Sequence, residues 1–66
     1  MQIILNGKEY QLNGPVSIED LLKDLGHDGS RLVVELNSTI INKELYSATV
    51  LKEGDSLEMV RLVGGG

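Results

Sequence analysis

Residues 56–66 read Ser56-Leu57-Glu58-Met59-Val60-Arg61-Leu62-Val63-Gly64-Gly65-Gly66. Leu57 and Met59 alternate with the residues between and after them, which is the period of a β-strand that buries one face. The strand over 56–63 runs into three glycines without a linker. Glycine has no Cβ, and three extended residues reach at most about 10 Å. We therefore expect a single domain over residues 1–63 and a flexible glycine tail over residues 64–66 that ends in a free carboxylate.

Turn and capping signals place the elements of the first half. Residues 1–12 read as a β-hairpin around Asn6-Gly7, the strongest two-residue signal for a type I′ turn. Ser17 is typical of a helix N-cap, and Gly26 is well placed to end the helix. Between them, apolar residues recur at i, i+3, i+4 and i+7. A short helix over about residues 18–25 is predicted, with one apolar face formed by Ile18, Leu21, Leu22 and Leu25.

The second half predicts two further strands and an irregular segment. Residues 31–37 are strand-like because β-branched valines lie between leucines. Ile40-Ile41 is expected to anchor a short strand or turn, followed by an irregular path over residues 42–49. Residues 52–55 form a turn before the last strand. The fold class is therefore α+β, with a mixed sheet of four to five strands and one helix packed on one face.

Alternation divides the apolar residues between two faces of this sheet. The expected core face comprises the helix leucines with Met1, Ile3, Leu5, Tyr10, Leu12, Val34, Leu36, Leu57 and Met59. Four apolar residues fall on the opposite face: Ile4, Val33, Val60 and Leu62. We interpret these four as a partner-binding patch near the root of the tail. Simple coverage by an edge or a loop is an equally weighted alternative.

Composition excludes several classes of function. The 66-residue chain has a net charge of −4, which disfavours binding to nucleic acid or to anionic membranes. It contains 0 cysteines, which excludes disulfides, thiolate metal sites and a cysteine nucleophile, and which fits a cytoplasmic location. His27 is the only histidine and lies in loop composition, where a solvated ring is the simplest interpretation. We expect no bound metal, no bound cofactor and no side-chain active site.

The remaining reactive group is the α-carboxylate of Gly66. A carboxylate is a poor electrophile, but conversion to an acyl-adenylate with ATP would give it a good leaving group. A hydrosulfide or persulfide could then leave sulfur on the carbonyl as a thiocarboxylate. A glycine terminus suits this chemistry because no side chain blocks access to the carbonyl.

Three stretches together resemble a known family. Leu36-Asn37, the run Lys52-Glu53-Gly54-Asp55-Ser56-Leu57-Glu58-Met59-Val60, and Val63-Gly64-Gly65-Gly66 look like the ThiS family, the sulfur carriers of thiamin biosynthesis. The resemblance covers the whole chain in length and element order. Departures are modest: the segment 40–43 lacks the proline and arginine often found there, and Ser38 replaces a common glycine.

The resemblance implies a β-grasp, ubiquitin-like fold and a protein co-substrate rather than an enzyme. It implies that Gly66 is adenylated by an E1-like enzyme (ThiF) and thiocarboxylated, and that the sulfur then passes to a thiazole synthase (ThiG). ATP and the sulfur donor would be used by those partners and not held by this chain. The surface around Val60 and Leu62 would face the partners.

Other functions remain open at this point. Sulfur carriers also serve molybdopterin synthesis and tRNA thiolation. A ubiquitin-like modifier uses the same Gly-Gly ending to form isopeptide bonds on lysines. A plain interaction module with inert glycines is the third alternative.

Overall fold

The computed structural model describes residues 1–62. The end of the predicted last strand and the whole glycine tail, residues 63–66, lie outside the described residues. The elements in chain order are β1 (Gln2–Leu5), β2 (Lys8–Gln11), α1 (Ile18–Asp24), η1 (Gly29–Arg31), β3 (Leu32–Leu36), β4 (Thr39–Ile41), η2 (Lys43–Leu45) and β5 (Ser56–Arg61), where η marks a 3-10 turn.

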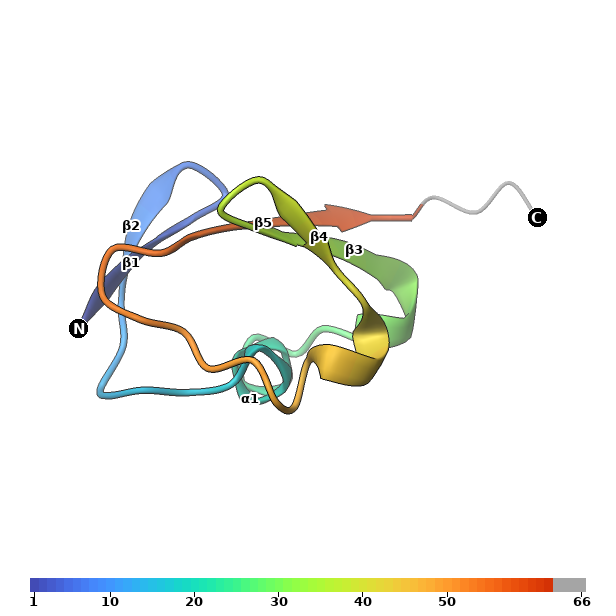
Figure 1. The fold of residues 1–66 in the computed structure, drawn as a ribbon, viewed down its shortest axis with the longest axis horizontal. Helices are drawn as coiled ribbons and strands as arrows, with labels where there is room; N and C mark the ends of the chain where they lie inside the picture. Colours follow the sequence, from blue (N-terminus) through green and yellow to red (C-terminus); the bar gives the residue numbers. More distant parts are fainter. Residues whose placement is uncertain (63–66) are drawn as a thin grey trace.

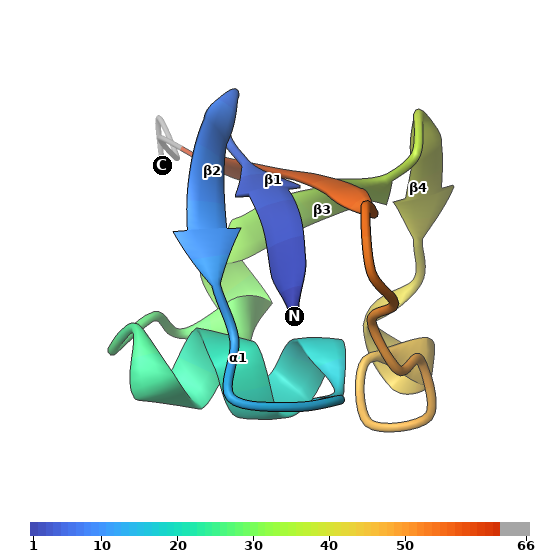
Figure 2. The same ribbon diagram turned by 90° about the vertical axis from the view of Figure 1, so that its left-hand side faces the viewer.

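The strands form one five-stranded mixed sheet in the order β2-β1-β5-β3-β4. β1 and β5 are parallel, and the other neighbouring strands are antiparallel. The sheet forms one layer, and α1 lies across its lower side with the segment after β4 beside it (Figures 1 and 2). The predicted fold class, a mixed sheet with one helix on one face, is confirmed.

Local sequence signals account for the first half. Asn6 and Gly7 both have positive φ, 50° and 82°, as the two central residues of a type I′ turn require. The Oγ of Ser17 accepts a hydrogen bond from the backbone N–H of Asp20 at 3.1 Å, so Ser17 caps the helix as predicted. Gly26 has φ 75° and follows the last helical turn, which is the conformation that favours glycine there.

The core lies between the sheet and α1. Its buried residues are Ile3, Ile18, Leu21, Leu22, Leu32, Val34, Tyr46, Leu51 and Leu57. The other predicted core residues, among them Met1, Tyr10 and Met59, are partly buried and pack against this cluster. The sequence analysis missed Tyr46 and Leu51, because the segment 42–51 has no periodic pattern. The signal that could have identified these two core residues is that each is an apolar side chain in an otherwise polar, irregular segment.

The turn before β5 is held by side chains of the β3–β4 connection. Asn37 Nδ2 donates to Asp55 Oδ1 at 3.1 Å, and the Ser56 N–H donates to Asn37 Oδ1 at 2.9 Å. Asp55 Oδ2 accepts the Lys52 N–H at 2.8 Å. Asn37 and Asp55, which contribute to the family resemblance, therefore fix the start of β5. Ser38, where glycine is common, has φ 72°, a conformation that costs a residue with a Cβ more than it costs glycine.

Tyr46 gives the core a pH-dependent contribution to stability. Burial raises the pKa of the Tyr46 phenol above its ordinary value of 10.0. The unfolded chain then loses this proton at a lower pH than the folded chain does, so stability is complete below pH 10 and falls as pH rises through the folded pKa. We expect the free energy of unfolding of Tyr46→Phe to fall less steeply than that of the parent in the alkaline window above pH 10.0. Urea unfolding across that window measures it, and parallel curves would contradict the prediction.

Candidate functional site

The last described residues leave from the middle of the sheet. β5 lies between β1 and β3 and is hydrogen-bonded to both. Leu62, just past the end of β5, still donates its N–H to the carbonyl oxygen of Arg31 at 2.8 Å. Only Ser56 and Leu57, at the start of β5, also pair with β1, whereas residues 57–61 pair with β3. Pairing with β3 therefore positions the point from which residues 63–66 begin.

The four predicted patch residues do not form one continuous cluster. Val33 and Val60 are directly opposite each other on β3 and β5, on the sheet face away from α1. Ile4 instead pairs with Ser56, four residues along β5 from Val60, which separates them by about 13 Å. Leu62 is exposed beyond the end of the strand. Only the Val33–Val60 pair with neighbouring Leu62 could form the apolar surface near the tail.

Two carboxylates and one isoleucine lie on this outer face near the Val33–Val60 pair. Glu35 and Glu58 are directly opposite each other on β3 and β5, between the Val33–Val60 pair and Ile4. Ile40 of β4 is opposite Glu35 and is 64% exposed, the most exposed large apolar side chain described. Like charges opposite each other destabilise an antiparallel pair. The sequence analysis did not assign Ile40 to this face, although the neighbour Ile41 packs on the core and alternation turns Ile40 outward.

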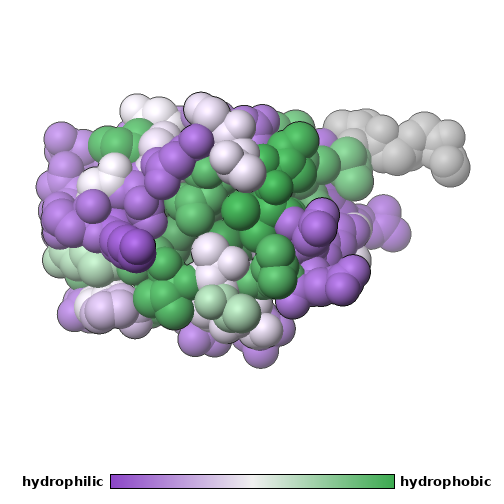
Figure 3. All heavy atoms as spheres, viewed as in Figure 1, coloured by the Kyte–Doolittle hydropathy of each residue, from purple (hydrophilic) through white to green (hydrophobic). Residues whose placement is uncertain are grey.

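Apolar residues are also exposed on the side where β4 and the segment after it lie. In Figure 3, which shows this side, hydrophobic residues gather in the middle of the surface and are surrounded by hydrophilic ones. Leu45 and Val50 of this segment are about half exposed, at 49% and 50%. Nothing in the alternation of the strands predicted this second apolar surface.

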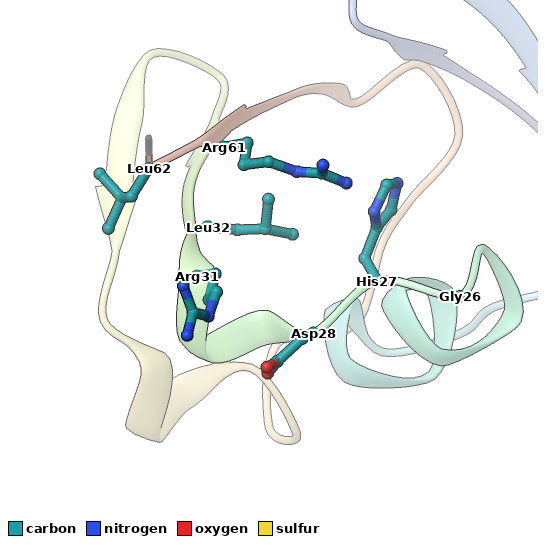
Figure 4. Close-up of a pocket in the computed structure, with 7 residues that line it drawn as sticks. All are labelled: Gly26, His27, Asp28, Arg31, Leu32, Arg61 and Leu62. Carbon is teal, nitrogen blue, oxygen red and sulfur yellow. The ribbon is translucent and has the colours of Figure 1, made fainter. Parts of the chain in front are cut away.

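A pocket of about 330 Å³ opens at the same end of the sheet as Leu62. It is lined by Gly26, His27, Asp28, Arg31, Leu32, Arg61 and Leu62. Arg61 extends from β5 past Leu32 toward the ring of His27, whereas the Asp28 carboxylate points away from both (Figure 4). His27, which the sequence analysis expected to be solvated in a loop, is only partly exposed here and borders a cationic pocket.

The Asp28 carboxylate is already hydrogen-bonded to Ser30. Its Oδ1 accepts hydrogen bonds from the Ser30 hydroxyl at 2.7 Å and from the Ser30 N–H at 3.0 Å. These two bonds, together with the charges of Arg31 and Lys43, hold the pKa of Asp28 below its ordinary value of 3.8. Asp28 therefore carries a negative charge at neutral pH and serves mainly to shape the turn before β3.

Within residues 1–62, no three or more His, Cys, Asp or Glu side chains are grouped so that they could hold a metal ion. None of the helices in that part of the chain is long and apolar enough to cross a membrane. The three predicted tail residues, Gly64, Gly65 and Gly66, lie outside the described range, so their role stays a prediction.

Comparison with known proteins identifies the family. The model of the ThiS family matches residues 3–66. The chain belongs to the ThiS family. The crystal structure of a thiamine biosynthesis protein (ThiS) from Geobacter metallireducens is similar over 100% of both chains, with a TM-score of 0.87 and 32% sequence identity. This likeness confirms the β-grasp fold that the resemblance implied.

Curated relatives of this ThiS-family chain differ in length. The sulfur carrier protein ThiS of Bacillus subtilis is 38% identical over 63 residues, which cover 94% of this chain and 96% of the relative. A thiazole synthase of Paramagnetospirillum magneticum is 36% identical over all 66 residues, but the chain spans only 20% of that protein's length. Segments of this kind therefore occur both as small carriers and within a longer protein.

Proposed function

We propose that this chain is a sulfur carrier in thiamin biosynthesis and acts as a protein co-substrate rather than as an enzyme. The observation that carries the proposal is the match to the ThiS family through residue 66, at the end of three glycines that follow a central strand. The similarity to the Bacillus subtilis sulfur carrier, which extends over nearly all of both chains, supports the same function.

The proposed chemistry takes place on the carboxylate of Gly66. A carboxylate oxygen attacks the α-phosphorus of ATP and displaces pyrophosphate, which leaves an acyl-adenylate. A hydrosulfide then attacks the carbonyl carbon, AMP leaves, and the product is a thiocarboxylate. Gly64 and Gly65 present no side chains that would hinder entry into a narrow adenylating site. This chemistry requires that Gly66 carries a free carboxylate in the mature protein.

Two partners follow from this chemistry. An E1-like enzyme, comparable to ThiF, would bind ATP and activate Gly66, and a sulfur donor would act with it. A thiazole synthase, comparable to ThiG, would receive the sulfur. The similarity between this chain and a segment of the Paramagnetospirillum magneticum thiazole synthase supports the second partner, because segments of one chain are held at high effective concentration. We place these steps in the cytoplasm.

The direct test is the intact mass of the protein after incubation with ATP, a thiamin-pathway adenylating enzyme and sulfide. We expect a mass gain equal to the replacement of one oxygen by sulfur, and none when ATP is omitted. An unchanged mass, with an enzyme that loads its own carrier, would reject the proposal. Transfer of the sulfur in a thiazole-forming assay then distinguishes this pathway from molybdopterin synthesis and tRNA thiolation, and cellular lysine conjugates would indicate a protein modifier.

The Val33–Val60 pair supports a prediction for partner binding. Val60 is 55% exposed on the outer sheet face, beside the acidic Glu58. A glutamate there would add a third carboxylate next to Glu35 and Glu58 and remove apolar contact area. We expect Val60→Glu to weaken binding to the adenylating enzyme about tenfold, which corresponds to about 1.4 kcal/mol. Fluorescence titration of the two purified proteins measures the Kd.

The matched control is Val50→Glu, which makes the same change at a residue that is 50% exposed away from this face. It should leave the Kd within about twofold of the parent value. Thermal melting of both variants verifies that each is folded. Equal Kd values for the two variants would remove Val60 from the interface.

A further inference from the structure

Both arginines and the only histidine of the chain border one pocket. The sequence contains six lysines and arginines against ten acidic residues, yet Arg31, Arg61 and His27 all line the pocket at the end of β5. The pocket therefore brings two positive charges together in an acidic protein. Such a local reversal of charge favours an anionic partner group.

The position of Arg61 follows from the sheet register. Arg61 is opposite Leu32, and Leu32 is buried on the core face, so Arg61 also lies on the side of the sheet that faces α1. Its guanidinium extends past Leu32 toward His27 (Figure 4). Of the described residues that line the pocket, only Asp28 has a carboxylate, so the two arginines leave the lining with a net positive charge.

The pocket is adjacent to the start of the tail. Leu62 both lines the pocket and follows β5 directly. Gly66 is the fourth residue after Leu62, so its carboxylate can reach at most about 14 Å from the Leu62 backbone. A partner group held in the pocket would therefore set the distance between the domain and the site where Gly66 reacts.

We propose that this pocket receives an acidic side chain of the adenylating enzyme and thereby sets the register of the tail in the active site. The inference rests on the proposed function, because it needs an enzyme that acts on Gly66. A carboxylate fits the planar guanidinium of Arg61 through two parallel hydrogen bonds, a geometry that lysine does not offer. Arg31 at the start of β3 adds a second positive charge at the rim.

A structural role for Arg61 makes a different prediction. The aliphatic part of an arginine can cover a buried apolar residue such as Leu32 while its charge contacts only water. In that case the charge is dispensable, and neutral variants that remain folded should react normally. The two explanations are separated by kinetics and not by stability alone.

The experiment measures ATP–pyrophosphate exchange by the adenylating enzyme as a function of carrier concentration. We expect Arg61→Gln and Arg31→Gln each to raise the KM for the carrier about tenfold, with kcat changed less than about twofold. Arg61→Lys, which keeps the charge, should recover part of the loss. Lys52→Gln is the matched control, because it removes one positive charge from the turn before β5, at the other end of that strand. Its KM should stay within about twofold of the parent value.

Binding without ATP gives a second readout. The Kd of the parent should weaken with added NaCl more steeply than that of the Arg31→Gln, Arg61→Gln double variant, since salt screens the lost ion pair. The pocket proposal alone would be overturned if the parent supports exchange and the arginine variants have the same KM as Lys52→Gln. A KM below the parent value would overturn it as well. No exchange with the parent, by an enzyme active on its own carrier, would overturn the proposed function.

Discussion

A chain without Gly66 will not be loaded with sulfur at a useful rate. The deletion leaves Gly65 with an identical carboxylate, but it draws that group back by about 3.5 Å. A displacement of about 1 Å from the reactive geometry can cost a hundredfold in rate. We expect the rate of thiocarboxylate formation, followed by intact mass, to fall at least about a hundredfold.

Gly64→Ala is the control for this deletion, because it keeps the length of the tail and adds one methyl group two residues from the carboxylate. Its loading rate should stay far above that of the deletion. Both variants should melt at the temperature of the parent, since glycine has no side chain that could contribute to a core. Loading of the shortened chain at the parent rate would remove Gly66 from its proposed role.

Leu21→Ala will remove a large part of the stability of the domain. Leu21 is 1% exposed in α1 and packs in the cluster between helix and sheet. Truncation of a buried leucine to alanine costs about 2–5 kcal/mol, because apolar contacts are lost and a cavity remains. A domain of this size has a free energy of unfolding of roughly 3–10 kcal/mol, so the loss is a large fraction of the total. Urea denaturation measures the loss.

Leu45→Ala is the matched control, since Leu45 is 49% exposed in η2. Its cost should stay below about 0.5 kcal/mol, as expected for a surface substitution. Similar losses for the two variants would mean that α1 does not form the core as described. The comparison tests the packing of the helix against the sheet and does not depend on any function.

Local sequence signals predicted the secondary structure well where they were strong. The Asn6-Gly7 turn, the Ser17 cap, Gly26 after the helix and the leucine periodicity of α1 are each interactions between residues close in the chain. Such interactions depend little on the rest of the fold. The segment after β4 lacked these signals, and Tyr46 and Leu51 became core residues only because α1 and the sheet leave a space that they fill.

Some features of the candidate site were likewise predictable from the sequence, whereas others are visible only in the fold. Residue order and a two-residue period were enough to predict the two faces of β5, the glycines that follow it and the family resemblance. The folded sheet was needed to show which faces of different strands meet. It separated Ile4 from Val60, put Glu35 opposite Glu58, and brought Arg61 to His27 and Arg31. Strand order and register fix these neighbours, and both are set by the packing of distant segments around one core.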